Sequence, residues 1–192
     1  MFYHNTNFEG GSVFQGKVIF RVESISLKTH WVMTIMDQYT RRIIGFSAEA
    51  GNLDSQCFCR MLNKIISTIA LPNVSSDNDP LFEYSRWKAN LRILEIDEIK
   101  TIPKVPISHP FIERLIGTVR REHLDQMLFW GSYDLEKKLG EFQEYYNSHR
   151  MHSSLNTIPD GMGREDTAKI VDINKYRWKK HCRGFFQTPI AA

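Results

Sequence analysis

The sequence has few cysteines, no long apolar run and little excess charge of either sign. Its three cysteines, Cys57, Cys59 and Cys182, form no framework of pairs, and no second cysteine or histidine pair stands near Cys57 and Cys59 to complete a zinc site. No stretch approaches the roughly 20 apolar residues that a membrane-spanning helix needs, and the N-terminus lacks a basic region followed by an apolar one. These absences argue against a disulfide scaffold, a membrane protein and an exported chain, and we expect a cytoplasmic protein.

The composition is that of an ordinary folded domain, with 192 residues of which 42% are hydrophobic. The net charge of +3 does not by itself indicate a nucleic-acid partner. The distribution is more informative, because five cations lie within residues 175–183 and alternate there with Tyr176 and Trp178. A basic run with interleaved aromatic rings is typical of contacts with a nucleic-acid backbone, and a solvated surface is the alternative interpretation.

The pattern of apolar residues predicts an α/β domain with a mixed sheet. We expect a loose leader over residues 1–16, a core over 17–155 and a basic C-terminal tail with a terminal strand over 156–192. Alternating or continuous short apolar runs predict strands over 18–27, 31–36, 42–47, 71–74 and 99–102. Apolar residues at helical spacing predict helices over 54–69, 81–91, 110–127 and 132–149.

The residues most indicative of chemistry are two acids, Asp77 and Glu113. Asp77 follows a predicted strand, and Glu113 lies near the start of a predicted helix, on the face shared with Ile116 and Arg120. Carboxylates from two separate elements can meet at one end of a sheet, where they would suit Mg²⁺ or Mn²⁺. Taken alone, a helical glutamate is usually a solvated charge and an aspartate after a strand is usually a turn former.

Four segments of the chain together resemble a known family. The segments 27–46, Ser76-Asp-Asn-Asp-Pro80, 108–122 and 145–155 are similar, in the same order, to the integrase core domain of bacterial insertion-sequence transposases, which are relatives of retroviral integrases. Asp77 and Glu113 are separated by 35 residues, which matches the spacing of the second and third catalytic acids in that family. The resemblance extends over about residues 17 to 190.

The resemblance implies an RNase H-like fold with a mixed five-stranded sheet, three antiparallel strands followed by two parallel ones, flanked by helices. It implies a DDE-type polynucleotidyl transferase that cuts and joins DNA during transposition or integration, using three acids and two Mg²⁺ or Mn²⁺ ions. Double-stranded DNA, both transposon ends and target, is the implied partner, and a homo-oligomer is compatible with the resemblance. Asp77 and Glu113 match the second and third acids and would be the catalytic and metal-binding residues.

The first acid of the family's triad is missing from this sequence. Its position on the first strand is occupied by Val18, and no aspartate precedes Asp37. Glu23 is a poor substitute, because an offset of five residues places it on the opposite face of the strand. Asp37 stays open as a compensating acid: if the first two strands pair through Lys28 and Thr29, it falls nearly opposite Phe20 and near position 18. We therefore expect an impaired site that holds metal weakly.

The family's longer members carry a helix-turn-helix region ahead of the core, whereas only the short leader stands there in this sequence. This difference suggests a remnant whose reading frame begins, or was joined, just inside the catalytic domain. A non-catalytic remnant that binds DNA or oligomerises is therefore the main alternative to a transposase with an impaired site. A hydrolase of the RNase H type fits the fold but not the four segments.

The remaining expectations concern cations, histidines and tryptophans. Phosphate contacts are expected at basic positions on the 110–127 helix and in the C-terminal run, namely Arg114, Arg120, Arg121, Lys179 and Lys180. His149 and His152 have the spacing of a zinc pair but no cysteine or acid close by, so we expect no metal there. Trp130, like Trp31 and Trp87, is expected to anchor the core, and Trp178 in the basic run is the candidate for stacking on bases.

Overall fold

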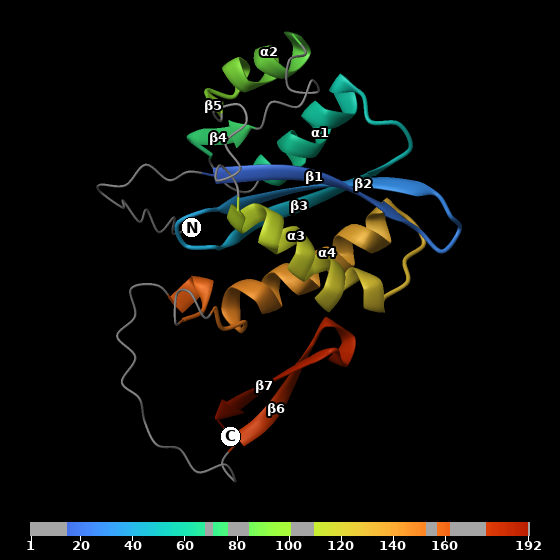
Figure 1. The fold of residues 1–192 in the computed structure, drawn as a ribbon, viewed down its shortest axis with the longest axis vertical. Helices are drawn as coiled ribbons and strands as arrows, with labels where there is room; N and C mark the ends of the chain where they lie inside the picture. Colours follow the sequence, from blue (N-terminus) through green and yellow to red (C-terminus); the bar gives the residue numbers. More distant parts are fainter. Residues whose placement is uncertain are drawn as a thin grey trace.

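The computed structural model describes residues 15–67, 71–76, 85–100, 110–152, 157–161 and 176–191. These residues form a five-stranded sheet of order β3-β2-β1-β4-β5 and a separate two-stranded sheet of β6 and β7 (Figure 1). In the large sheet β1 pairs antiparallel with β2, and β2 antiparallel with β3, whereas β4 runs parallel to both β1 and β5. The predicted mixed sheet of three antiparallel and two parallel strands is confirmed.

The strand bounds differ from the predicted ones by one to four residues. The strands are β1 (Gln15–Glu23), β2 (Thr29–Asp37), β3 (Ile43–Ala50), β4 (Asn73–Ser76) and β5 (Asp97–Lys100). β1 ends four residues earlier than predicted, because a turn closes between Ser24 and Lys28, where the Ser24 amide donates to the Lys28 carbonyl at 3.0 Å. Leu27 adopts a positive φ of 58° in this turn. Because Ile25 and Leu27 in this turn are apolar, the sequence pattern predicted that the strand continues through them.

Helices cover both faces of the large sheet. α1 (Ser55–Ile66) and α2 (Ser85–Ile93) lie on one face, and α3 (Pro110–Glu122) and α4 (Ser132–Ser148) on the other (Figure 1). The predicted helices are confirmed over these residues, except that α3 gives way to a short 3₁₀ turn at Leu124–Gln126. Asp54 caps α1 by accepting a hydrogen bond from the Cys57 amide at 2.6 Å. In the described part of the chain, no helix is long and apolar enough to cross a membrane.

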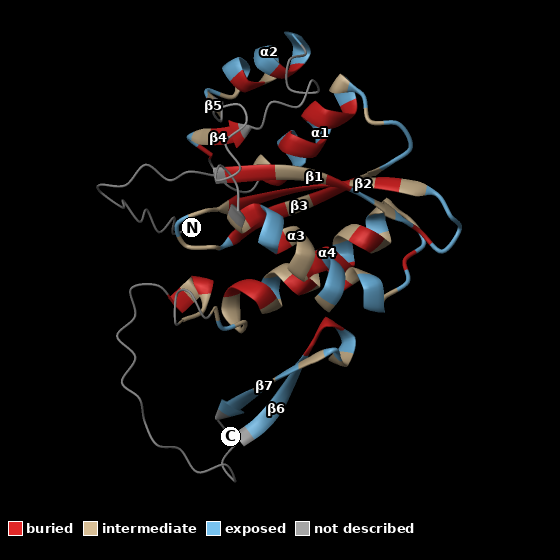
Figure 2. Cartoon of the chain, in the orientation of Figure 1, coloured by how far each residue is buried: buried red, intermediate tan, exposed pale blue. Residues whose placement is uncertain are grey.

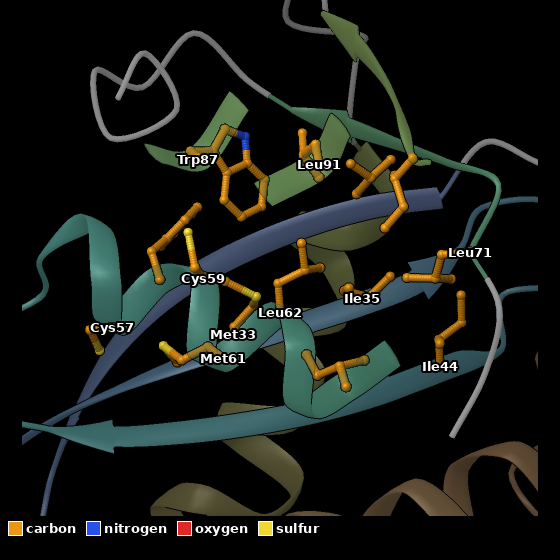
Figure 3. Close-up of a cluster of buried hydrophobic side chains, with 14 residues drawn as sticks. Met33, Ile35, Ile44, Cys57, Cys59, Met61, Leu62, Leu71, Trp87 and Leu91 are labelled. Carbon is orange, nitrogen blue, oxygen red and sulfur yellow. The ribbon is translucent and has the colours of Figure 1, made fainter. Parts of the chain in front are cut away.

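Two hydrophobic clusters, one on each face, hold the helices to the sheet. The first contains Met33 and Ile35 of β2 together with α1 residues and Trp87 and Leu91 of α2, as Figure 3 shows. The second joins Val32 and Met36 of β2 to the buried residues of α3 and α4. Alternate residues of β2 therefore enter opposite clusters, and this central strand is buried on both sides (Figure 2). Trp87 anchors the core as predicted, whereas Trp130 is 73% exposed and does not.

α4 also pairs with the backbone of β3, the edge strand of the sheet. The Asn147 side chain accepts a hydrogen bond from the Ile43 amide at 2.8 Å and donates to the Ile43 carbonyl at 2.9 Å. Gln143 donates to the carbonyls of Ile43 and Ile44, and Glu136 accepts from the Ala48 amide at 2.9 Å. A stripe of polar side chains on one helix thus takes the place of a neighbouring strand.

The C-terminal hairpin packs against the outer side of α4. It consists of two antiparallel strands, β6 (Tyr176–His181) and β7 (Phe186–Ala191), where the sequence predicted one terminal strand. The Phe186 ring stacks on Tyr145 of α4 with centroids 4.1 Å apart, and His181 lies at the same distance from His149. The hairpin is largely exposed apart from this contact (Figure 2).

Removal of the Asn147 amide should destabilise the domain through the β3 edge. In Asn147→Ala both backbone groups of Ile43 lose their partner in a buried place, and we expect the free energy of unfolding to fall by about 2–4 kcal/mol. Urea unfolding followed by circular dichroism measures this. The exposed neighbour on the same helix supplies the control, Glu144→Ala, which should change stability by less than about 0.5 kcal/mol. Equal effects of the two substitutions would contradict the role of Asn147.

A second prediction concerns pH and His123. This ring is buried, its Nε2 lies 3.0 Å from the Lys138 carbonyl, and burial lowers its pKa from 6.5 to about 4. The unfolded chain therefore takes up the proton first as the pH falls, so stability is full above about pH 6.5 and is lost between there and pH 4. Between pH 7 and 5 we expect a loss of about 1–2 kcal/mol from this residue.

The measurement compares urea unfolding of the parent and of His123→Gln at both pH values. The glutamine amide can still donate to the Lys138 carbonyl but does not titrate, so the variant should show a weaker dependence on pH. Part of the dependence should persist, because burial also lowers the pKa of His152 to about 4. A variant as sensitive to acid as the parent would contradict the assignment to His123.

Candidate active site

Glu113 lies on the exposed side of α3, at the helix end nearest Pro110. The neighbouring residues Ile112 and Leu115 are buried in the second cluster, so α3 presents an apolar face to the sheet and leaves the Glu113 carboxylate accessible. Arg120, on the same helical side as Glu113, donates from Nη2 to the Arg21 carbonyl of β1 at 2.9 Å. Its guanidinium also lies over the Phe20 ring at 5.4 Å. Arg120 therefore ties α3 to β1.

Val18 lies in the middle of β1 and packs into the same cluster as the buried face of α3. Directly opposite it in β2 stands Thr34. Opposite residues of an antiparallel pair share a face, with Cβ atoms about 5 Å apart. The Thr34 hydroxyl is buried and has no hydrogen-bond partner among the described residues. Position 18 thus places an apolar side chain beside a buried hydroxyl that lacks an acceptor.

β4 lies beside β1 in the sheet. This strand pairs in parallel with β1 at Gly16 and Ser75, and it ends at Ser76. Asp77, the next residue, lies outside the described residues, as does Lys175 in the basic run. Of the three positions that the sequence comparison matched to catalytic acids, the structure describes the surroundings of Val18 and Glu113, and their catalytic role stays a prediction.

The described residues do not fit a centre for two metal ions. Mg²⁺ and Mn²⁺ take oxygen ligands, and a two-ion centre needs carboxylates that both ions share. Val18 supplies no oxygen, and the described part of the chain contains no group of three histidine, cysteine or acidic side chains close enough to hold a metal. Glu113 is the one predicted metal ligand among the described residues. These residues alone do not support a catalytic step that uses two metal ions.

The two substitute acids lie elsewhere and have local partners. Asp37 stands opposite Gln15, not near Phe20 as the alternative pairing proposed, because the first turn is centred near residue 26 and not at Lys28 and Thr29. Its carboxylate accepts hydrogen bonds from the Tyr39 amide at 2.9 Å and the Thr40 hydroxyl at 2.7 Å, which close the turn between β2 and β3. Glu23 ends β1 in an exposed ion pair with Arg21.

The predicted phosphate contacts occupy three different environments. Arg120 contacts β1, as described, whereas Arg114 lines a cavity beside α3 and Arg121 is exposed near the end of that helix. Lys179 and Lys180 are adjacent on β6 and so point to opposite faces of the hairpin. Lys179 shares its face with His181, whose ring contacts α4, and Lys180 shares the other face with Trp178. Trp178 is 65% exposed.

His149 and His152 do not form a common site. His149 contacts His181 of the hairpin, and His152 packs edge-on against Tyr146 with ring centroids 4.7 Å apart. Burial is the main cause that lowers the pKa of His149 and of His181, and the nearby charge of Lys179 adds to it. The sequence contained no signal for the His149–His181 contact, because the two residues belong to segments that meet only through the folded tail.

Comparison with known proteins places these features in context. Residues 95–159 match the family described as Integrase core domain. A protein of an insertion element of Xanthomonas euvesicatoria, the IS476 uncharacterized 39.2 kDa protein, is 26% identical over 128 residues. That match covers 66% of this chain but 37% of the relative, so the chain spans well under half of the length of that protein.

Solved integrase structures share the fold. The catalytic core of BIV integrase is 15% identical with a TM-score of 0.56, and the match covers 79% of this chain and 93% of that core. The HTLV-2 integrase catalytic core, solved in complex with magnesium, is 12% identical with a TM-score of 0.57 and covers 78% of this chain and 95% of its own. An integrase intasome of simian T-cell lymphotropic virus gives a TM-score of 0.62 at 16% identity, over 86% of this chain and 61% of that chain.

At such low sequence identities, the solved structures show a likeness in fold alone. The relationship in sequence rests on the family match and on the insertion-element relative. Together they confirm that this chain has an RNase H-like fold and resembles the integrase core domain of insertion-element proteins.

Proposed function

We propose that this chain is the catalytic-core part of a DDE-type transposase, built to cleave and join DNA in transposition or integration, and that its active site is impaired at position 18. Asp77 and Glu113 would be the two acids that persist. The observation that carries the proposal is the position of Val18, which lies on the face of the sheet covered by the helix of Glu113 and on the strand that pairs with β4.

The register between β1 and β4 supports a shared site. Gly16 and Ser75 are paired in parallel, so the last residues of β4 lie beside the part of β1 that precedes Val18. Along α3 the step from Arg120 back to Glu113 is two turns, about 10 Å, and the step from Arg21 back to Val18 on β1 is also about 10 Å. Since Arg120 contacts Arg21, these steps favour a location of Glu113 near Val18.

The unpartnered hydroxyl of Thr34 supports the inference that position 18 once held an acid. A buried donor normally has an acceptor, and an aspartate carboxylate at position 18 would supply one. With valine in its place the hydroxyl is left without a partner among the described residues. The same position then contributes neither a metal ligand nor a negative charge.

In this proposal the protein retains the parts that bind and orient DNA. Arg114, Arg121 and Lys180 would contact backbone phosphates, which position a duplex without reading its sequence. When bound, divalent metal would supply activation of the attacking water or 3′-hydroxyl and would neutralise charge on the phosphate, but Val18 leaves too few oxygens for a pair of ions. The second candidate is a cytoplasmic remnant that binds DNA or oligomerises but does not cut DNA. The apolar side chain at position 18 favours this candidate.

Val18→Asp is the direct test of the impaired site. The parent should bind Mg²⁺ or Mn²⁺ weakly and at most once, whereas the variant should hold two ions and nick plasmid DNA more than about tenfold faster, which corresponds to about 1.4 kcal/mol of transition-state stabilisation. Calorimetry with each metal and a nicking assay with Mn²⁺ measure both effects.

Val18→Asn is the matched control, because it has nearly the same shape as aspartate and can pair with Thr34 but carries no charge. It should leave metal binding and nicking at the level of the parent. Thermal melting with and without Mn²⁺ detects the cost of burying an unpaired carboxylate, which metal should offset. Two ions bound with micromolar affinity by the parent, or a folded Val18→Asp that binds two ions and leaves DNA intact, would show that position 18 alone does not silence the site.

A separate prediction concerns DNA binding by the hairpin. Lys180 points away from α4, so Lys180→Gln should lower the slope of log affinity against log salt by about one. Lys179 faces the histidines of the α4 contact, so Lys179→Gln should change the slope less, although both substitutions remove one charge. Fluorescence anisotropy of a labelled duplex over a salt series measures the slopes. Unchanged slopes in both variants would mean that this strand is a solvated surface.

A further inference from the structure

A cavity of about 270 Å³ lies between α3, the end of α4 and the turn that joins β2 to β3. Its polar lining consists of three arginines, a histidine, a threonine and a tyrosine, and no carboxylate is among its described lining residues: Arg41, Arg114, Thr118, Tyr146, Arg150 and His152. The cavity lies on a different side of α3 from Glu113, because adjacent helical residues point about 100° apart. It is therefore separate from the candidate active site.

Arg41 reaches the cavity from a strained turn. Its φ of 64° is in the left-handed region, which is uncommon for a long side chain, so the fold holds this residue at a cost in backbone energy. The guanidinium lies 3.0 Å from the centroid of the Phe111 ring, and one of its N–H groups donates to the Gln38 carbonyl. Its Nε is buried and has no hydrogen-bond partner among the described residues.

His152 presents a second buried nitrogen without a partner. Its main-chain N–H bonds the Thr157 carbonyl at 2.9 Å and its ring packs against Tyr146, yet Nε2 has no partner in the described part of the chain. Burial lowers the pKa of this ring to about 4, with the charges of Arg150 and Arg41 adding to the effect. The ring is therefore neutral at pH 7 and can donate one N–H.

Two carboxylates close to these arginines, Glu122 and Asp37, already have partners. Glu122 forms a two-pronged ion pair with Arg150, with Nη2–Oε1 and Nε–Oε2 distances of 2.7 and 3.0 Å. Asp37 accepts the hydrogen bonds that close the β2–β3 turn. Arg114 is exposed and forms no ion pair among the described residues. Burial is the main cause that lowers the pKa of Arg41, and the nearby charge of Arg114 adds a smaller effect in the same direction. The lining keeps an excess of positive charge and of N–H donors.

Three of the four segments that carry the family resemblance contribute residues to the lining of this cavity. The acids at 77 and 113 do not explain why these three segments meet here. Arg41 comes from the segment 27–46, Arg114 from 108–122, and Arg150 with His152 from 145–155. Guanidinium groups that converge from separate elements match the several oxygens of a phosphate, which accepts paired N–H donors.

We propose that this cavity binds a phosphate group. Its identification with a phosphate of the DNA backbone rests on the proposed function, whereas a free phosphate-containing molecule would use the same donors. Because Glu113 and Arg114 are adjacent on α3, a backbone phosphate held here would position the strand beside the candidate active site.

The first test uses inorganic phosphate as the probe on the whole chain. Phosphate in tenfold excess over its dissociation constant, compared with chloride at the same ionic strength, should raise the Tm of the parent by roughly 3–6 °C. Arg114→Gln should lose most of this rise. Arg114 is exposed, so the variant should fold, which circular dichroism checks. Lys137→Gln on the exposed side of α4 removes the same charge away from the cavity and should keep the rise.

NMR of the histidine rings supplies a readout that needs no variant. Phosphate should shift the His152 ring signals and raise the pKa of that ring, because a bound anion favours its charged form. Equal protection of the parent and Arg114→Gln, or His152 signals that phosphate does not move, would overturn the proposal.

A second arm identifies the source of the phosphate. If it is the DNA backbone, Arg114→Gln should lower the salt slope of duplex binding by about one, and inorganic phosphate should compete with DNA. An unchanged slope with retained phosphate protection would assign the cavity to a free phosphate compound. Failure of Val18→Asp to restore nicking would count against the proposed function alone, since the phosphate measurements do not depend on metal.

Discussion

The polar stripe of α4 against the outer edge of β3 is the contact on which the rest of this structure depends. An edge strand leaves a row of amides and carbonyls that need partners, and here Glu136, Gln143 and Asn147 supply them from one helix. The same helix buries Leu139 and Phe142 against the sheet. α4 is therefore fixed in both rotation and position, and its end can form one wall of the arginine cavity while its outer face receives the C-terminal hairpin.

The parallel half of the sheet has a different character, because its strands β4 and β5 have only four residues each. β4 lies between β1 and β5 and pairs in parallel with both. In the antiparallel pair of β1 and β2, the apolar side chain of Val18 stands opposite the Thr34 hydroxyl, which is buried and has no hydrogen-bond partner among the described residues. Sequences that specify a fold usually satisfy their buried polar groups, so a mismatch of this kind points to a position where function has changed.

Basic residues that look alike in the sequence have distinct physical roles in the fold. Arg120 is engaged with the backbone of β1, and Arg150 is paired with Glu122, so part of the positive charge holds elements together. Arg114 faces a cavity and Lys180 faces solvent beside Trp178, and these are among the charges that an anionic partner can reach. Net charge alone cannot separate these classes, because it does not register which donors are already satisfied.

Much of the fold could be predicted from residue patterns, because helices such as α1 and strands such as β2 leave regular periods of apolar residues. The β1–β2 register could not: Ile25 and Leu27 lie in the turn, and apolar turn residues cannot be distinguished by pattern from the end of a strand. That turn moved Asp37 opposite Gln15 and removed it as a neighbour of position 18.

The sequence by itself determined the order of the elements, the acids at 77 and 113 and the absence of an acid at 18, since these depend on residue identity and spacing. Only the tertiary structure decided that Thr34 faces Val18, that α4 completes the edge of β3, and that Arg41, Arg114 and Arg150 meet around one cavity. These facts depend on contacts between segments far apart in the sequence or on strand register, and local periodicity carries no information about either.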